Sequence, residues 1–460
     1  MSSSITSEVV DFLLRGSSLP IPVRNEAIAH IIDGLSLMLA GSRTECTRKL
    51  IEFIREDKRE GSSTLVGFDF KTDASDAALV NGVSGHVDDY DDTQLSASPD
   101  RIYGLLTHPT TPVLAAILAA GEKVKCSGGA FLEAFIAGFE VECKLAEAIN
   151  PEHYKRGFHS TGTLGAFGAC AASSLLLGLG EEELRHALGI TASMSSGIRA
   201  NFGTMTKSLH AGRAASNGVI ACFLAKRGFT ADKDSLDGKW GFMNVLGNGC
   251  DPEKIMGKMG KPYTLIYPGA SIKMYPCGSL AQPSMDMLLD MVLEEDLKPE
   301  DVLEVRLRAG PNILEPLRYE RPVDELQAKF SLQFGLACIL VKRRAGLWEY
   351  TAEVLNSPEI RTMMEKVKTI LDPEVARMGT DKMRSIVEVE LRNGRVLGHL
   401  ADTARGTPEK PLKDSELDDK FRQCASFVLD EKRTGQVLNA VRNLESMSDI
   451  RQLTSLLQSG

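Results

Sequence analysis

The first 265 residues are dominated by long segments in which apolar side chains repeat with the period of an α-helix, and this feature constrains the fold most strongly. In the segment 20–41, the apolar residues of one predicted helical face recur every three or four positions: Ile28, Ile31, Ile32, Leu35 and Met38. Pro22 suits the first turn of this helix, and Gly41 suits its end. The helical segments are rich in Ala, Gly and Leu, and small residues allow helix backbones to approach closely. The sequence therefore predicts a compact domain of mostly buried helices.

The pattern changes after about residue 265. Apolar and polar side chains alternate at 301–310 and at 385–400, as they do in half-buried β-strands. The Asn393-Gly394 dipeptide inside the second segment is typical of a hairpin turn. Helical patterns at 279–294 and 325–342 lie between these strands, so this part of the chain has an α+β pattern.

Helical patterns return after the polar stretch ADTARGTPEKPLKD. A chain of 460 residues is too long for one ordinary core, so two domains are expected. The predicted fold class is mainly α. A large all-helical domain takes residues 1–267 and 406–460, and a smaller α+β domain takes residues 268–405.

Composition excludes several classes of partner. The formal net charge is −9 and no dense basic run is present, which argues against nucleic acid or an anionic membrane surface. The first residues lack the pattern of a secretory signal peptide, and we expect no window with the roughly 18 apolar residues of a membrane span. The nine cysteines are scattered without a CxxC pair, which fits reduced thiols and no structural zinc. These features favour a cytoplasmic protein.

The stretch GHVDDYDDTQ (85–94) places one histidine, four aspartates and a threonine directly after an apolar helix. Clustered oxygens of this kind could bind a hard divalent cation, or one carboxylate could act as acid, base or orienting partner. The acidic end of a helix and its turn would have the same pattern. A dedicated calcium loop is disfavoured, because no EF-hand glycine and terminal glutamate follow.

Two histidines precede predicted helices. His108, in THPTTP, serves equally well in a helix cap or in a site. His159 and Ser160, in RGFHSTGTLGAFGA, open an apolar helix whose positive end can face an anion. The segment lacks both the GxxxxGK[ST] loop and a GxGxxG turn after a strand, so a small carboxylate is favoured over a nucleotide.

The stretch TMTKSLHAGR (204–213) spaces Lys207, His210 and Arg213 three residues apart at the start of an apolar helix. This is either a solvated helix start or an anion site. Lys273 and Cys277 lie where the helical pattern gives way to alternation, and domain boundaries are favoured places for ligand clefts. A nucleophilic Cys277 is disfavoured, because no Cys-His signature accompanies it.

Together these segments resemble the MmgE/PrpD family, which includes 2-methylcitrate dehydratases, cis-aconitate decarboxylases and an iminodisuccinate epimerase. The resemblance runs nearly end to end and rests on HVDDYDDT, THP, GFHSTGTLG, FGTMTKSLHAGRAASNG, KMYPCGSL and PEKPLKDSELDDKFR. It implies a large helical domain built from both chain ends, a smaller lid domain and a homodimer. It also implies an active site between the domains that uses neither a metal nor an organic cofactor.

Carried over by these motifs, the family's site positions fall on Asp89, Thr93, His108, His159, Lys207 and Lys273. The chemistry common to the family moves a proton on a carbon next to a carboxylate, so the implied substrate is a small di- or tricarboxylate. Charge then builds on an already anionic group, and the site must supply cations and hydrogen-bond donors. A histidine, or a lysine with a lowered pKa, can carry the proton near neutral pH.

The resemblance also suggests a role for each position. We expect His159 and Lys207 nearest the proton transfer, with Asp89 and His108 in support. The residues expected to bind substrate are Lys273, Thr93, Ser160 and Gln282. His210 and Arg213 are expected to support Lys207, to contact the substrate or to lie at a dimer contact.

Two departures from the family pattern bear on the reaction. Many relatives have Thr-His where this chain has Ala281 and Gln282, and glutamine cannot serve as an acid or a base. The segment TQLSASPDRIYGLL (93–106) is longer than in the decarboxylases, and Tyr319 is only a loose counterpart of a tyrosine that some of them use. We therefore expect dehydration of a citrate-type or 2-methylcitrate-type acid, with epimerisation of a dicarboxylate such as iminodisuccinate as the alternative. A cis-aconitate-type decarboxylase and a non-catalytic carboxylate-binding relative follow.

Overall fold

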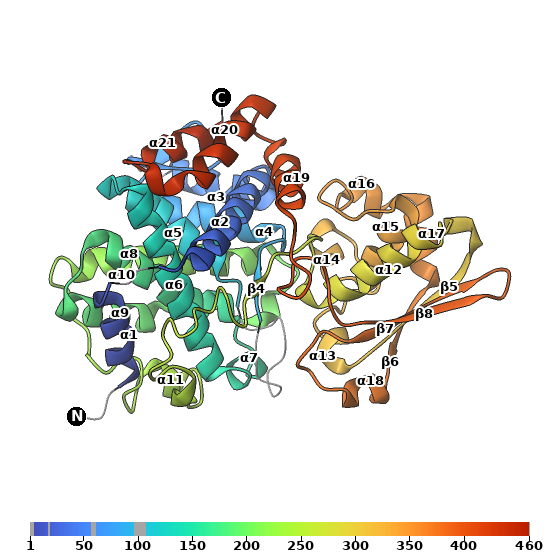
Figure 1. Cartoon of the computed structure of the whole chain (residues 1–460), viewed down its shortest axis with the longest axis horizontal. Helices are drawn as coiled ribbons and strands as arrows, with labels where there is room; N and C mark the ends of the chain where they lie inside the picture. Colours follow the sequence, from blue (N-terminus) through green and yellow to red (C-terminus); the bar gives the residue numbers. More distant parts are fainter. Residues whose placement is uncertain (1–3, 17–18, 57–60, 96–106, 460) are drawn as a thin grey trace. The chain divides into compact units, whose positions relative to one another are not determined.

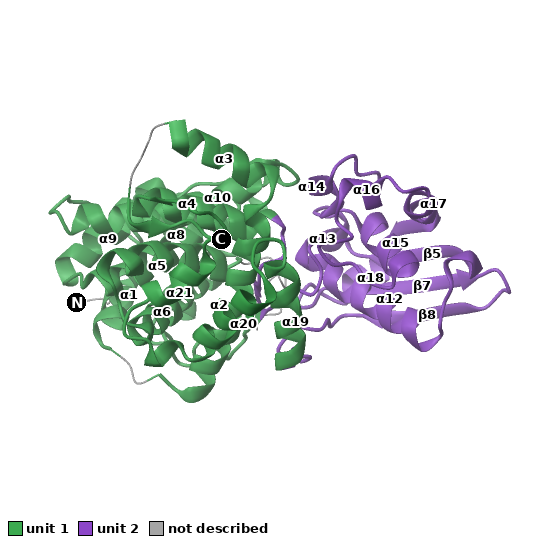
Figure 2. Cartoon of the chain, turned by 90° about the horizontal axis from the view of Figure 1, so that it is seen from above, with its two compact units in different colours: residues 1–87, 106–270, 414–460 green, residues 88–105, 271–413 purple. Residues whose placement is uncertain are grey.

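The structure is a computed structural model that describes residues 4–16, 19–56, 61–95 and 107–459 (Figure 1). Most of these residues are helical, which confirms a mainly α fold with a smaller α+β region. The chain divides into two compact units (Figure 2). Unit 1 holds residues 1–87, 106–270 and 414–460, and unit 2 holds residues 88–105 and 271–413. Residues 96–106 of the long segment after Thr93 lie outside the described residues, so the expected effect of this segment on the pocket stays a prediction.

Unit 1 is built from helices that both ends of the chain contribute. Its helices are α1 (Ile5–Leu14), α2 (Ile21–Ser42), α3 (Glu45–Glu56), α4 (Ala74–Val87), α5 (Thr110–Val124), α6 (Gly128–Ile149), α7 (Glu152–Lys155), α8 (Ser160–Leu177), α9 (Glu181–Met194), α10 (Met205–Ala225), α11 (Phe242–Val245), α19 (Asp414–Ala425), α20 (Glu431–Arg442) and α21 (Arg451–Thr454). Two short strands, β1 (Ser63–Thr64) and β2 (Lys71–Thr72), pair antiparallel. The C-terminal helices join this unit through a buried ion pair, in which Lys420 of α19 lies 2.7 Å from Asp33 of α2.

Glycines bring the central helices of unit 1 close together. A Cβ on Gly82 of α4 would lie 2.7 Å from the Cα of Gly212 in α10. A Cβ on Gly138 of α6 would lie 2.6 Å from the carbonyl oxygen of Gly168 in α8, and one on Gly218 of α10 would lie 2.5 Å from the backbone of Cys170. These distances are too short for any side chain, so the helices cross backbone to backbone, as the sequence predicts.

Among the described residues, one helix is long and apolar enough to cross a membrane, contrary to the expectation from the sequence. This helix is α8, with a mean hydropathy of 1.3 over 18 residues. Of that window, 89% is buried inside the structure, where α8 packs against α5, α6 and α10. Its apolar composition is therefore that of a core helix.

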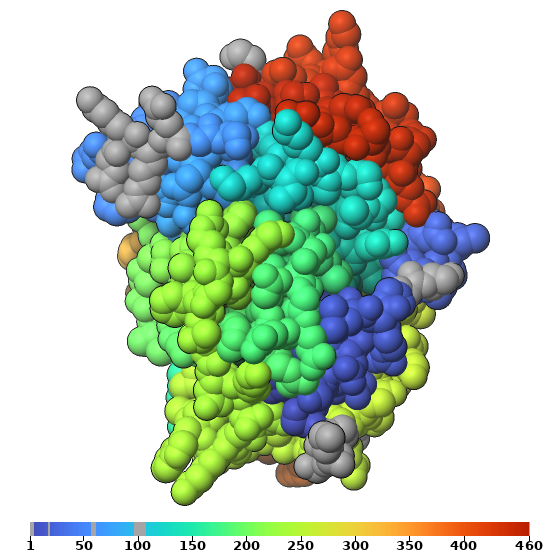
Figure 3. Space-filling view, turned by 90° about the vertical axis from the view of Figure 1, so that its left-hand side faces the viewer, coloured from blue at the N-terminus to red at the C-terminus, as the bar shows by residue number. Residues whose placement is uncertain are grey.

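The N-terminal helix is tied to the rest of unit 1 by a carboxylate. The backbone N–H of Ile5 and the hydroxyl of Thr6 donate to Asp237 at 2.6 and 2.7 Å. A carboxylate at the start of a helix also suits the helix dipole. Figure 3 shows α1, in blue, lying beside the green segment that contains α9, and the two helices are in contact.

Unit 2 contains a four-stranded sheet in the order β6-β5-β7-β8. β5 (Val302–Ala309) runs parallel to β6 (Val367–Leu371) and antiparallel to β7 (Ser385–Leu391). β7 and β8 (Val396–Ala401) form the predicted hairpin around Asn393-Gly394. Side chains of β5 and β7 alternate between buried and partly exposed, and Arg306 on the partly exposed side pairs with Glu388 and Glu390.

Helices cover the buried face of this sheet. α12 packs against β7 and β8, and α15 packs against β6. The helices of unit 2 are α12 (Gln282–Glu294), α13 (Pro311–Leu314), α14 (Glu325–Ala328), α15 (Leu332–Lys342), α16 (Ala352–Leu355), α17 (Pro358–Lys366) and α18 (Pro373–Arg377). The pattern predicted at 325–342 is thus two helices, because the hydroxyl of Ser331 caps a new helix by accepting from the N–H of Phe334. Two further short strands are β3 (Thr93–Gln94) in unit 2 and β4 (Ala270–Ser271) at the boundary between the units.

Candidate active site

His159 lies at the first position before α8, where the chain turns from an extended segment into the helix. Its backbone N–H donates to the carbonyl oxygen of Gly197 at 3.1 Å, and the preceding Phe158 forms a β-bridge with Ile198. The His159 side chain is buried, and its Nε2 atom has no hydrogen-bond partner among the described residues. The hydroxyl of the neighbouring Ser160 is also buried and lacks a partner there.

α10 brings Lys207 and His210 to the same place. Thr204 caps this helix through its hydroxyl, and Lys207 and His210 follow one turn apart on a buried face. The Nδ1 atoms of His159 and His210 lie 3.0 Å apart, which is a hydrogen-bond distance. The ring of Phe202 contacts both His159, at 5.0 Å between ring centroids, and Lys207, whose Nζ atom lies 5.5 Å from the Phe202 centroid.

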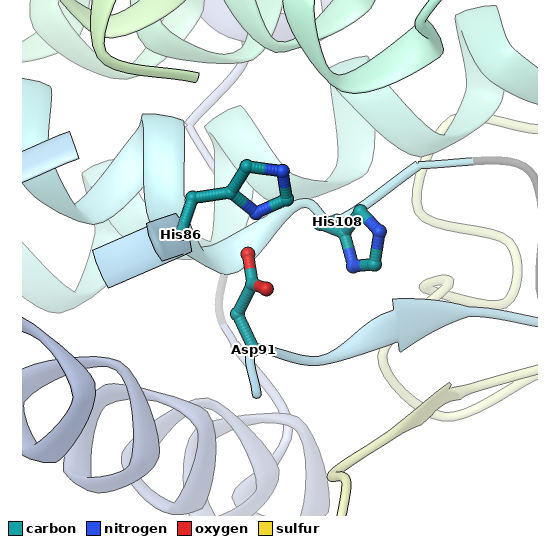
Figure 4. Close-up of side chains that lie close together, drawn as sticks. All are labelled: His86, Asp91 and His108. Atoms are coloured by element: carbon teal, nitrogen blue, oxygen red, sulfur yellow. The ribbon is translucent and has the colours of Figure 1, made fainter. Parts of the chain in front are cut away.

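Two further histidines complete a cluster in unit 1. His86 lies in the last turn of α4 and stacks on His159, with 5.5 Å between ring centroids. His108 precedes α5, and its ring lies 5.0 Å from that of His86. Figure 4 shows both side chains, together with Asp91, which follows His86 by five positions in the chain. We call His86, His108, His159 and His210 the histidine cluster.

Burial and the neighbouring basic groups lower the pKa of two members of this cluster, His159 and His210. Burial lowers the pKa of His159 well below 6.5, and the nearby His86, Lys207, His210 and His108 lower it further. Burial, with His86 and Lys207, also lowers the pKa of His210 to about 4. Both imidazoles are therefore neutral at pH 7 and can accept a proton.

The other expected site residues lie in unit 2, where several are bonded to one another. The Nζ atom of Lys273 lies 2.7 Å from a carboxylate oxygen of Asp89 and donates to its backbone oxygen at 2.9 Å. Both residues are buried, and Asp89 has a left-handed φ of 49°. The hydroxyl of Thr93 lies 2.6 Å from that of Ser279. A second buried ion pair joins Lys329 to Asp88 at 2.7 Å.

Gln282 holds the segment that follows Lys273. Its side-chain oxygen accepts from the N–H groups of Met274 and Tyr275 at 3.1 and 3.2 Å, and its nitrogen donates to the oxygen of Tyr275 at 2.9 Å. Burial raises the pKa of the neighbouring Cys277 to about 12. The thiol is therefore protonated at pH 7, in agreement with the argument against a cysteine nucleophile.

Comparison with known proteins identifies the family to which the chain belongs. The model of the MmgE/PrpD N-terminal domain matches residues 12–255, and that of the C-terminal domain matches residues 275–446. The chain belongs to the MmgE/PrpD family. This confirms the resemblance stated from the motifs.

Its relatives within the family include named enzymes. The cis-aconitate decarboxylase of Homo sapiens is 29% identical over 93% of this chain and 89% of its own length. A cis-aconitate decarboxylase-like protein of Aspergillus oryzae is 26% identical over 99% of this chain and 97% of its own length. The cis-aconitate decarboxylase of Aspergillus terreus is 25% identical over 99% and 96% of the two lengths.

The expected site positions thus fall into two groups. In unit 1 the structure brings His108, His159 and Lys207 together, and it adds His86, for which the motifs predict no role. In unit 2 it pairs Asp89 with Lys273. The expectation that both groups share one substrate between the domains stays a prediction. His86 and His159 lie 73 positions apart in the sequence, so no local sequence pattern predicts that their side chains are in contact.

Proposed function

We propose that the chain is a lyase that moves a proton on the carbon next to a carboxylate of a small di- or tricarboxylate. Dehydration of a citrate-type hydroxy acid is the reaction that we favour. The observation that carries this proposal is the Nε2 atom of His159, which is buried and has no partner among the described residues. This nitrogen belongs to a neutral imidazole of the histidine cluster, and Lys207 lies near it.

Such a nitrogen suits the first step of a dehydration. His159 takes the proton from the carbon, and the electron pair of the broken C–H bond passes toward the adjacent carboxylate. Lys207 and the positive end of α8 favour the charge that develops there. The hydroxyl group on the next carbon then leaves with a proton, and Lys207 is a suitable donor for it.

Decarboxylation of a cis-aconitate-type acid is the second candidate, because the named relatives are cis-aconitate decarboxylases. In that reaction the C–C bond to a carboxylate breaks, and the carbon that loses CO2 then receives a proton. The site must therefore start with a proton to give. A neutral His159 is better prepared to take a proton than to give one, which is why we place dehydration first.

The test is proton and carbon NMR in D2O with citrate, 2-methylcitrate, cis-aconitate, malate and iminodisuccinate. A dehydratase gives new vinyl signals, whereas a decarboxylase converts cis-aconitate and releases CO2. An epimerase incorporates deuterium without forming a vinyl group. The same samples are run with His159→Gln, and with His399→Gln as the control, because His399 lies exposed on β8 of unit 2. Absence of any exchange, or full turnover by His159→Gln, would overturn the proposal.

A further inference from the structure

The contact between His159 and His210 is a hydrogen bond with only one proton to share. Their Nδ1 atoms lie 3.0 Å apart, and each neutral imidazole carries one proton on one of its two nitrogens. One ring must therefore donate through Nδ1 and the other must accept there. The choice decides whether Nε2 of His159 carries a proton or a lone pair.

The two rings are held in this arrangement by the backbone around them. A Cβ on Gly197, whose φ is 138°, would lie 3.1 Å from Cγ of His210. A Cβ on Gly162 would lie 2.9 Å from the His210 Cβ. Gly197 also accepts the hydrogen bond from the backbone N–H of His159. The same short segment therefore fixes the backbone of one histidine and borders the ring of the other.

We propose that His210 is a positioning residue that accepts a hydrogen bond from Nδ1–H of His159 and leaves the Nε2 atom of His159 as a free lone pair. The alternative tautomer would bury an N–H group at Nε2 with no acceptor among the described residues, and orphaned buried N–H groups are rarer than orphaned acceptors. The charge of Lys207 and the positive end of α8 also favour a lone pair over an N–H group at this place.

This inference deepens the proposed function and rests on it, since it names the residue that makes His159 a base. When His159 takes a proton at Nε2, its Nδ1–H becomes the donor of a charge-assisted hydrogen bond to His210, which is stronger than the neutral one. A neutral acceptor gives this support without raising the pKa of His159 as far as a carboxylate would. The groups that face His159 are His86, His108, Lys207 and His210, and those that face His210 are His86, Lys207 and His159.

The first test is NMR of the free protein labelled with 15N-histidine, in which each tautomer has its own pattern of nitrogen shifts. The chain has eight histidines, and the signals of His159 are assigned by their loss in His159→Gln. We expect His159 to carry its proton on Nδ1 in the wild type and in His210→Asn, whose amide oxygen can accept. In His210→Phe we expect a mixture of tautomers. A proton on Nε2 of His159 in the wild type would overturn the inference.

The second test is the pH dependence of turnover in His210→Asp. A carboxylate beside Nδ1 should raise the pKa of His159, so the acid side of the pH profile should move to higher pH by about one unit or more. If His210 only fills space, His210→Asn and His210→Phe would lose activity equally and His210→Asp would leave the profile in place, which would also overturn the inference. The tautomer is measured without substrate. A protein with the expected tautomer but no turnover would therefore refute the proposed function and leave this inference standing.

Discussion

Lys273 and Asp89 form a buried pair in unit 2, and each neutralises the charge of the other. Removing one partner of such a pair leaves an uncompensated charge in the interior, whereas removing both partners leaves no buried charge. The expected role of Lys273, binding a substrate carboxylate, must therefore be compatible with the carboxylate that it already holds.

We predict that Lys273→Met lowers the free energy of unfolding by about 3–5 kcal/mol. The double variant Lys273→Met/Asp89→Leu should recover much of this loss, because no charge is then left unpaired. Urea unfolding measures both. Lys155→Met is the control, since its pair with Glu152 is exposed and should contribute less than about 1 kcal/mol. A single variant as stable as the wild type would show that the pair is not closed to water.

His153 gives unit 1 a pH dependence that is separate from catalysis. Its ring is buried and stacks on Phe158, with 4.5 Å between centroids, and its nitrogens bond to the oxygen of Leu246 and the hydroxyl of Thr163. Burial lowers its pKa to about 4, from 6.5. Between pH 6.5 and pH 4, the His153 side chain is protonated in the unfolded chain but not in the folded protein. The free energy of unfolding therefore falls as the pH falls.

For His153 alone we predict a loss of about 1.4 kcal/mol for each pH unit between pH 6.5 and 4. Urea unfolding at pH 7, 6 and 5 measures the slope. His153→Gln should be less stable at pH 7 but should have the flatter slope, and His399→Gln should keep the wild-type slope. Parallel curves for His153→Gln and the wild type would mean that His153 is protonated in the folded protein.

At the scale of the element, the crossing of α4 and α10 places two members of the histidine cluster, because His86 lies in the last turn of the first helix and His210 lies in the second. The crossing depends on Gly212, where a Cβ would lie 2.3 Å from the backbone oxygen of Leu79. That oxygen cannot turn away as a side chain could, so the two helices would have to separate.

We predict that Gly212→Ala costs about 3 kcal/mol or more of stability. The change should also lower activity, because it moves His210 away from its partners. The matched control is Gly435→Ala in α20, where nothing lies within 4 Å of the added Cβ. This control should gain about 0.5–1 kcal/mol, since alanine favours a helix over glycine. Thermal melting followed by circular dichroism compares the two, and equal melting temperatures would contradict the crossing.

Most helices could be predicted from the sequence because their apolar period is long and their ends carry Pro, Gly or Ser. Strand β6 was not predicted. Its five residues follow α17 directly, and its partner β5 lies some 60 positions earlier, so nothing local distinguishes it. In the candidate site, too, local motifs could be predicted and contacts between distant segments could not. The motifs pointed to His108, His159 and Lys207, but the hydrogen bond between His159 and His210 depends on how α8 and α10 pack.

At the scale of the whole molecule, the chain and its proposed substrate carry charge of the same sign. The formal net charge is −9, so long-range attraction cannot draw a polycarboxylate to the protein. Binding must depend on local groups, and in unit 1 these are Lys207, the histidine cluster and the positive end of α8. The homodimer implied by the family resemblance stays a prediction at this scale.

Local binding of this kind has a pH dependence whose sign can be derived. A bound anion raises the pKa of the histidines beside it, so the complex takes up protons that the free protein does not hold. Affinity should therefore rise as the pH falls from 8 to 6.

A ligand at 100 times its Kd adds about 2.7 kcal/mol to the stability of the folded protein. We predict that citrate or cis-aconitate raises the melting temperature by a few degrees, and by more at pH 6 than at pH 8. Lys207→Met should lose most of this rise, whereas Lys155→Met should keep it. Sulfate at equal ionic strength measures the effect of any anion. If sulfate stabilises the wild type as much as the polycarboxylates do, or if the pH dependence has the opposite sign, then the histidine cluster and Lys207 do not form the carboxylate site.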